Sequence, residues 1–129
     1  MGNRSERWIK LVAGSVEVEA CLNDTGTAVG VWDMLPVTGT VMSWGDELYF
    51  TIPLDMGLED PREIVEAGDI AYWPQGKALC LFFGPTPISR AGEIRPASPV
   101  NLVARIKGDP RVLKAVAPGT AITVKRERA

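Results

Sequence analysis

The stretch GDIAYWPQGKALCLFFGPTP, residues 68–87, decides how this 129-residue chain folds. It contains four of the nine aromatic residues of the chain and two short apolar runs, separated by the segment WPQGK at residues 73–77. Apolar runs that are bounded by glycine and proline predict two strands joined by a tight turn. Aromatic side chains beside Gly, Pro and Lys further predict a concave surface around that turn.

Composition limits the class of protein and its partners. The length fits one domain over residues 1–129, and 46% hydrophobic residues is typical of a globular protein. A net charge of -2 gives no broad basic surface, so no nucleic-acid partner is expected. Because the chain has no run of 18 apolar residues and no signal-peptide core, we expect no membrane association and a cytoplasmic location.

The inventory of reactive side chains excludes several chemistries. The chain has no histidine, which removes the commonest general base, histidine-dependent triads and most zinc sites. Cys80 lies in an apolar run and Cys21 shares a strand face with Glu17, and both are interpreted as structural thiols. The acidic residues at 59–69 are interpreted as helix caps and a solvated face, so neither a metal nor a cofactor is expected.

Periodicity predicts a hairpin and short helices in addition to the central stretch. Residues 8–12 and 15–22 form the hairpin, with the tails at 1–6 and 126–129 frayed. Residues 23–25 can cap a helix that Pro36 ends. Further short helices are expected from Asp60 to a glycine stop at Gly68, and after Asp109.

A second hairpin is predicted over residues 38–53, with Gly45-Asp46 as its turn. This register pairs Trp44 with Glu47 and Met42 with Tyr49. It places large, partly polar side chains on one face: Thr40, Met42, Trp44, Glu47, Tyr49 and Thr51. The opposite face is predicted to be core: Val41, Ser43, Leu48, Phe50 and Ile52. With strands at residues 100–107 and 121–125, the chain is mainly β, with seven or eight strands and two or three short helices. One closed or nearly closed antiparallel barrel accounts for this pattern.

Side chains near the two central hairpins have more than one interpretation. Lys77 can bind an anion or an aromatic ring, or it is a solvated turn residue. Glu47 can be a polar anchor or a general base, or an exposed strand charge. Tyr49, Trp73 and Phe83 can contact a ligand or fill the barrel.

Four segments together carry a family resemblance: residues 43–50 (SWGDELYF), 60–65 (DPREIV), 68–87 and 94–101 (IRPASPVN). With them the chain resembles, over residues 7–125, the small cyclophilin-like-fold family of bacteria and archaea. Its members are single domains without an established biochemical role. The resemblance implies a closed eight-stranded antiparallel β-barrel with short helices at its ends. It also implies a cleft lined by Trp44, Glu47, Tyr49, Trp73, Pro74, Lys77, Phe83, Gly84, Pro85, Thr86 and Ser98.

The same resemblance argues against prolyl isomerase activity. True cyclophilins carry an arginine in the region that corresponds to residues 40–49, whereas no arginine occurs here between Arg7 and Arg62. Only Arg90 or Arg95, in a later loop, could substitute for it. Fold alone does not carry function.

The sequence is therefore compatible with three functions. The first is a module that binds a small ligand or an extended peptide in an aromatic cleft, to which Met42 and Arg90 also contribute. The second is an enzyme, either a divergent prolyl isomerase or one that uses Glu47 and Lys77. The third is an interaction domain or subunit of a larger complex, and the strand at residues 16–22 could pair in a homodimer.

Overall fold

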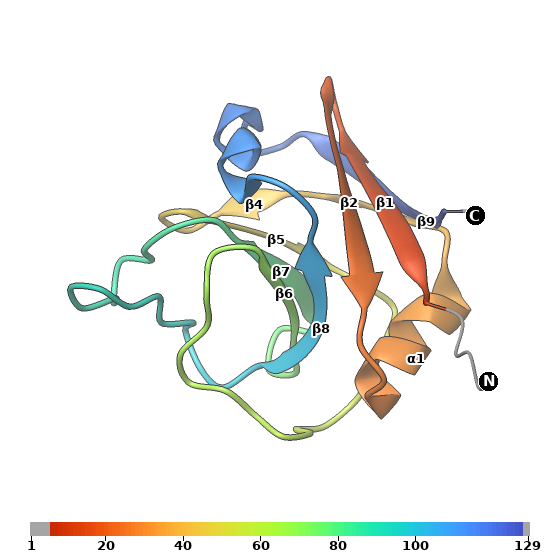
Figure 1. Ribbon diagram of the computed structural model, residues 1–129, viewed down its shortest axis with the longest axis horizontal. Helices are drawn as coiled ribbons and strands as arrows, with labels where there is room; N and C mark the ends of the chain where they lie inside the picture. The colour runs from red at the N-terminus through yellow and green to blue at the C-terminus, as the bar shows by residue number, and fades with distance from the viewer. Residues whose placement is uncertain (1–5, 128–129) are drawn as a thin grey trace.

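Within residues 6–127, the part of the chain that the computed structural model describes, one antiparallel sheet curves into a nearly closed barrel (Figure 1). The strand order is β3-β9-β1-β2-β8-β6-β7-β5-β4. In chain order the elements are β1 (Trp8–Ala13), β2 (Val16–Leu22), α1 (Gly26–Met34), β3 (Val37–Thr40), β4 (Met42–Ser43), β5 (Glu47–Thr51), β6 (Asp69–Trp73), β7 (Ala78–Phe82), β8 (Asn101–Ile106), the 3-10 helix η1 (Pro110–Ala115) and β9 (Ala121–Arg126).

A single bent segment closes the barrel. Strands β3 and β4 stand at opposite ends of the strand order, yet only Val41 separates them in the chain. Val41 itself is fully buried, and its backbone binds the carbonyl of Thr120 and the N–H of Gly119. The expected eight strands and the nine that are described differ only by this bend, so the predicted mainly β barrel is confirmed.

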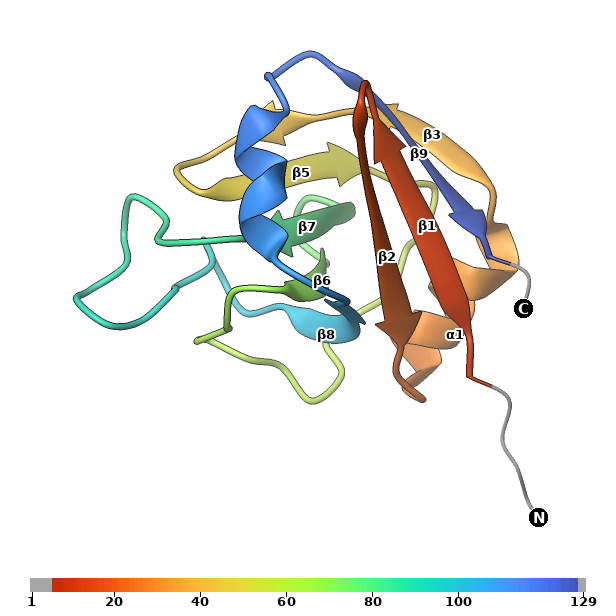
Figure 2. The same ribbon diagram turned by 45° about the horizontal axis from the view of Figure 1, so that its top comes forward.

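Two short helices lie near opposite ends of the barrel (Figure 2). The predicted cap of α1 is confirmed, because the Thr25 hydroxyl accepts a hydrogen bond from the backbone N–H of Ala28 at 3.1 Å. A second cap comes from a distant loop: the Glu59 carboxylate accepts the backbone N–H groups of Gly26 and Thr27 at 3.0 and 2.8 Å. These bonds satisfy backbone donors that a helix start leaves free.

The strands β5, β6 and β7 are covered on both faces, which matters for the site. Side chains alternate between the faces of a strand. Leu48, Tyr72 and Leu79 point into the barrel, where the main core lies. A second cluster lies on the other face of these strands, beneath the long loops at residues 52–68 and 84–99: Val65, Ala71, Cys80, Phe82 and Val100.

The predicted helix from Asp60 to Gly68 is wrong. This segment is irregular and forms isolated bridges from Arg62 to Val100 and from Val65 to Ile94. Its backbone N–H groups donate to the carbonyls of these distant partners, so they are not available for a helix. Tertiary contacts here override a good local start-and-stop pattern.

Two further expectations are corrected at the edges of the barrel. The strand β2 is no free edge, because it pairs with both β1 and β8. The C-terminal tail is ordered further than predicted: Arg126 belongs to β9, and its guanidinium donates to the carbonyl of Trp32. Residues 1–5 and 128–129 lie outside the described part of the chain. Between residues 6 and 127, no helix has both the length and the apolar character needed to cross a membrane.

Candidate functional site

The register of three strands brings the candidate side chains together. The predicted pairing of Met42 with Tyr49 is confirmed, and Tyr49 in turn pairs with Cys80. Cys80 also pairs with Ala71, which is two residues before Trp73. Tyr49, Cys80 and Trp73 therefore share the outer face of the sheet, and Glu47 lies on the same face one strand period away.

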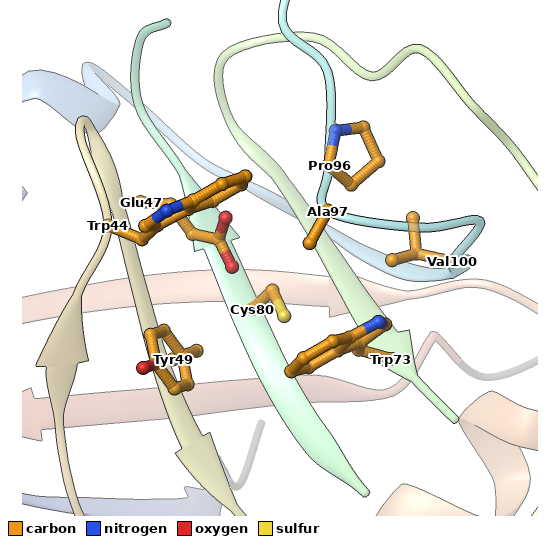
Figure 3. Close-up of a pocket in the computed structure, with 8 residues that line it drawn as sticks. All are labelled: Trp44, Glu47, Tyr49, Trp73, Cys80, Pro96, Ala97 and Val100. Carbon is orange, nitrogen blue, oxygen red and sulfur yellow. The ribbon is translucent and has the colours of Figure 1, made fainter. Parts of the chain in front are cut away.

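A cavity of about 260 Å³ opens on this face (Figure 3). Its wall comes from the hairpin turn, three strands and the loop before β8. The lining residues are Trp44, Glu47, Tyr49, Trp73, Cys80, Pro96, Ala97 and Val100. Aromatic and aliphatic side chains predominate, with one carboxyl group among them, which is the usual make-up of a small-molecule site.

Three aromatic rings surround the cavity. The rings of Tyr49 and Trp73 meet edge to face, with centroids 6.5 Å apart and planes at 82°. Figure 3 shows the Glu47 carboxyl and the Cys80 thiol in the space between the indoles of Trp44 and Trp73. All three rings are partly exposed, so they are open to a ligand rather than sealed in a core.

Glu47 is the polar group of the cavity. It is only 5% exposed, and its Oε1 atom is buried without a hydrogen-bond partner among the described residues. Burial raises the pKa of its carboxyl to about 7, and a hydrogen bond from Cys80 opposes this shift. Near neutral pH, Glu47 can therefore both accept and release a proton.

The Cys80 thiol, unlike the Glu47 carboxyl, does not ionise near neutral pH. Burial raises the pKa of its thiol well above the ordinary value, and the negative charge and hydrogen bond of Glu47 raise it further. A thiol with a raised pKa is a poor nucleophile, because the thiolate is the reactive form. In this site Cys80 is a neutral hydrogen-bond donor to Glu47.

The loop that covers the cavity is held by its own hydrogen bonds. The Trp73 indole donates to the Ser98 hydroxyl at 2.5 Å, which ties the ring to the loop. The Ser89 hydroxyl accepts the backbone N–H groups of Thr86 and Arg95, both at 2.9 Å. The Thr86 hydroxyl donates to the carbonyl of Arg95. These contacts fix Pro96 and Ala97 opposite the strands.

The structure brings together only part of the predicted set. Trp44, Glu47, Tyr49 and Trp73 line the cavity, whereas Thr86 and Ser98 support the loop or an aromatic ring from behind. The remaining residues of the predicted set are not among those that line this cavity: Met42, Pro74, Lys77, Phe83, Gly84, Pro85 and Arg90.

Two of these placements have clear physical reasons. Phe83, expected on the cleft, is 6% exposed and packs in the main core inside the barrel. Lys77 has a positive φ of 50° that turns the chain, and its ammonium lies 3.6 Å from Asp55. Lys77 is thus paired on the surface rather than placed among the aromatic rings.

Four lining residues are not predicted from the sequence. Cys80 was interpreted as structural because all of β7 is apolar, so alternation could not reveal its outward face. Pro96, Ala97 and Val100 come from an irregular loop and its junction with β8, where no periodic signal exists. The hydroxyl-rich and proline-rich composition of residues 84–99 was the only available hint.

Comparisons with known proteins agree with this architecture. The solution structure of the hypothetical protein AF2241 from Archaeoglobus fulgidus is similar, with a TM-score of 0.81 and 42% identity, covering 98% of this chain and 100% of that one. The structure of McbB in complex with tryptophan shares the fold at 16% identity, with a TM-score of 0.73, covering 94% of this chain and 45% of that one. Among curated proteins, none matches the sequence.

The sequence profile described as Cyclophilin-like matches residues 7–125, nearly the whole described chain. The barrel, its short helices and the likeness to AF2241 fit that match. The chain belongs to the cyclophilin-like family.

Proposed function

We propose that the protein binds a small molecule in the cavity on the outer face of β5, β6 and β7. The observation that carries this proposal is the placement of a nearly buried carboxyl with an unpartnered oxygen among three partly exposed aromatic rings. A volume of about 260 Å³ favours a metabolite of modest size over an extended peptide.

The barrel does not need Glu47 for its stability. A buried carboxyl with one oxygen left unpartnered destabilises the folded state, and an apolar side chain would pack there at lower cost. Departures from good packing of this kind are expected at functional sites. The neighbour McbB was solved with tryptophan bound, which is in keeping with an aromatic ligand but, at 16% identity, indicates no shared site.

The four tryptophans allow a direct binding test. Trp44 and Trp73 line the cavity, whereas Trp8 and Trp32 lie elsewhere, against Lys107 and Arg126 respectively. Fragments with aromatic rings should shift the indole N–H signals of Trp44 and Trp73 in two-dimensional NMR and leave those of Trp8 and Trp32 in place. Uniform shifts, or none across an aromatic fragment library, would refute the proposal.

A second candidate function is catalysis in the same cavity. A carboxyl whose pKa is about 7 suits general acid–base chemistry at neutral pH. Turnover of a bound fragment that is lost in Glu47→Gln, while binding of the fragment persists, would favour this function over simple binding.

A further inference from the structure

The inference concerns the charge of the ligand, and it rests on the proposed function of this cavity. In an apolar cavity a carboxyl group is either protonated or, as a carboxylate, paired with a positive partner, because a buried unpaired charge is costly. The eight lining residues include no Lys or Arg. The partner must therefore come from the rest of the chain, from a metal ion or from the ligand.

Three cations among the described residues are paired with carboxylates other than Glu47. The guanidinium of Arg95, in the loop that covers the cavity, contacts Glu93 at 3.0 Å. The ammonium of Lys77 contacts Asp55 at 3.6 Å, and the guanidinium of Arg105 contacts Asp69 at 2.8 Å. No charged neighbour contributes to the shifted pKa of Glu47, whose causes are burial and the Cys80 hydrogen bond alone.

A metal ion does not fit the donor set. Hard cations take six or more oxygen ligands, and softer ones favour several nitrogen or sulfur ligands. The cavity offers one carboxyl and one thiol, and the described residues contain no group of three or more side chains that could hold a metal ion.

An organic cation fits both features of the cavity. The faces of aromatic rings attract cations, most strongly for tryptophan, and cages of such rings recognise ammonium groups. Trp44, Tyr49 and Trp73 supply the rings, and Glu47 supplies the countercharge and a hydrogen-bond acceptor.

We propose that the cavity recognises a small aromatic or aliphatic ammonium ion, whose charged nitrogen binds the Glu47 carboxylate between the indoles of Trp44 and Trp73. The other titratable groups that line the cavity are the Cys80 thiol from β7 and the Tyr49 phenol from β5. The Cys80 thiol is neutral near pH 7, since its pKa is raised. Binding of the cation is therefore coupled to loss of one proton from Glu47.

The test compares 2-phenylethylamine with its neutral analogue 2-phenylethanol on the full chain by isothermal titration calorimetry. At pH 8 the amine should bind roughly tenfold tighter than the alcohol or better, because its hydrogen bond to Glu47 is charge-assisted. At pH 6 the affinity for the amine should fall about tenfold, since an alkylammonium keeps its proton while Glu47 gains one. The affinity for the alcohol should change little.

Glu47→Gln is the matched variant, close in size to the original side chain. It should lose the pH dependence of amine binding and most of the preference for the amine over the alcohol, and binding of the alcohol shows that its cavity is intact. Equal affinities in the wild-type protein, or tighter binding of the amine at pH 6 than at pH 8, would overturn this inference and leave the proposed binding function standing. If neither compound binds, the binding function itself fails for ligands of this class.

Discussion

Replacing Glu47 with glutamine should change how stability depends on pH. The carboxyl has a pKa of 4.5 in an unfolded chain and about 7 in the folded protein. Between these values the folded state holds a proton that the unfolded state has released, so stability falls as pH rises through this window. The full pKa difference corresponds to a loss of about 3 kcal/mol at alkaline pH.

Urea unfolding of both proteins at pH 5 and pH 8 measures this effect. Between these two pH values, the wild-type protein should lose about 2.5 kcal/mol more free energy of unfolding than Glu47→Gln, given the two pKa values. Other carboxyl groups titrate alike in both proteins, so their contributions cancel in the comparison. Equal pH dependence in the two proteins would refute the reasoning, because it would mean that Glu47 is not buried as described.

Three further predictions concern the surroundings of the site. Gly76→Ala should push the Trp73 ring aside, since a Cβ at Gly76 would lie 2.4 Å from two ring carbons, and it should cost about 1–3 kcal/mol in urea unfolding. Gly57→Ala is the control, because a Cβ at Gly57 would have no atom within 4 Å. If the Trp73 indole signal does not move in Gly76→Ala, the described packing of Gly76 against the Trp73 ring is contradicted. Cys80→Ala should raise the pKa of Glu47 further, because the lost hydrogen bond favours the carboxylate, and a lower value in an NMR titration would be evidence against that bond. Asn101→Leu should destabilise the protein by about 1–3 kcal/mol in urea unfolding, since it removes the hydrogen bonds that the buried Asn101 side chain makes with the Glu59 N–H and the Gly57 carbonyl. Thr38→Val at the surface should have little effect.

Much of the barrel could be predicted because local pattern and tertiary structure agree there. The Gly45-Asp46 turn fixes the register of β4 and β5, so the pairing of Met42 with Tyr49 followed from the sequence. The helix α1 followed from its Thr25 cap and the proline after it. The segment from Asp60 to Gly68 shows the limit, because its backbone partners lie more than 25 residues away in the chain.

The candidate site could be predicted in part, for a similar reason. Glu47 and Tyr49 were found through strand alternation, which works where one face is polar. Alternation fails in β7, where both faces are buried, so the role of Cys80 was hidden. The family resemblance placed Phe83 on the cleft, whereas alternation puts it on the same face as Leu79 and Leu81, in the barrel core. Loop residues such as Ala97 belong to no periodic pattern, and hydrogen bonds within the loop and from Trp73 to Ser98 hold them over the cavity.

The carboxyl carbon of Glu47 provides the most direct test of the account. Its ¹³C chemical shift can be followed against pH in the free protein and in the presence of saturating 2-phenylethylamine. The account predicts an inflection near pH 7 in the free protein, moved to lower pH by the amine. An inflection near 4.5 in the free protein, or one that the amine does not move, would contradict it.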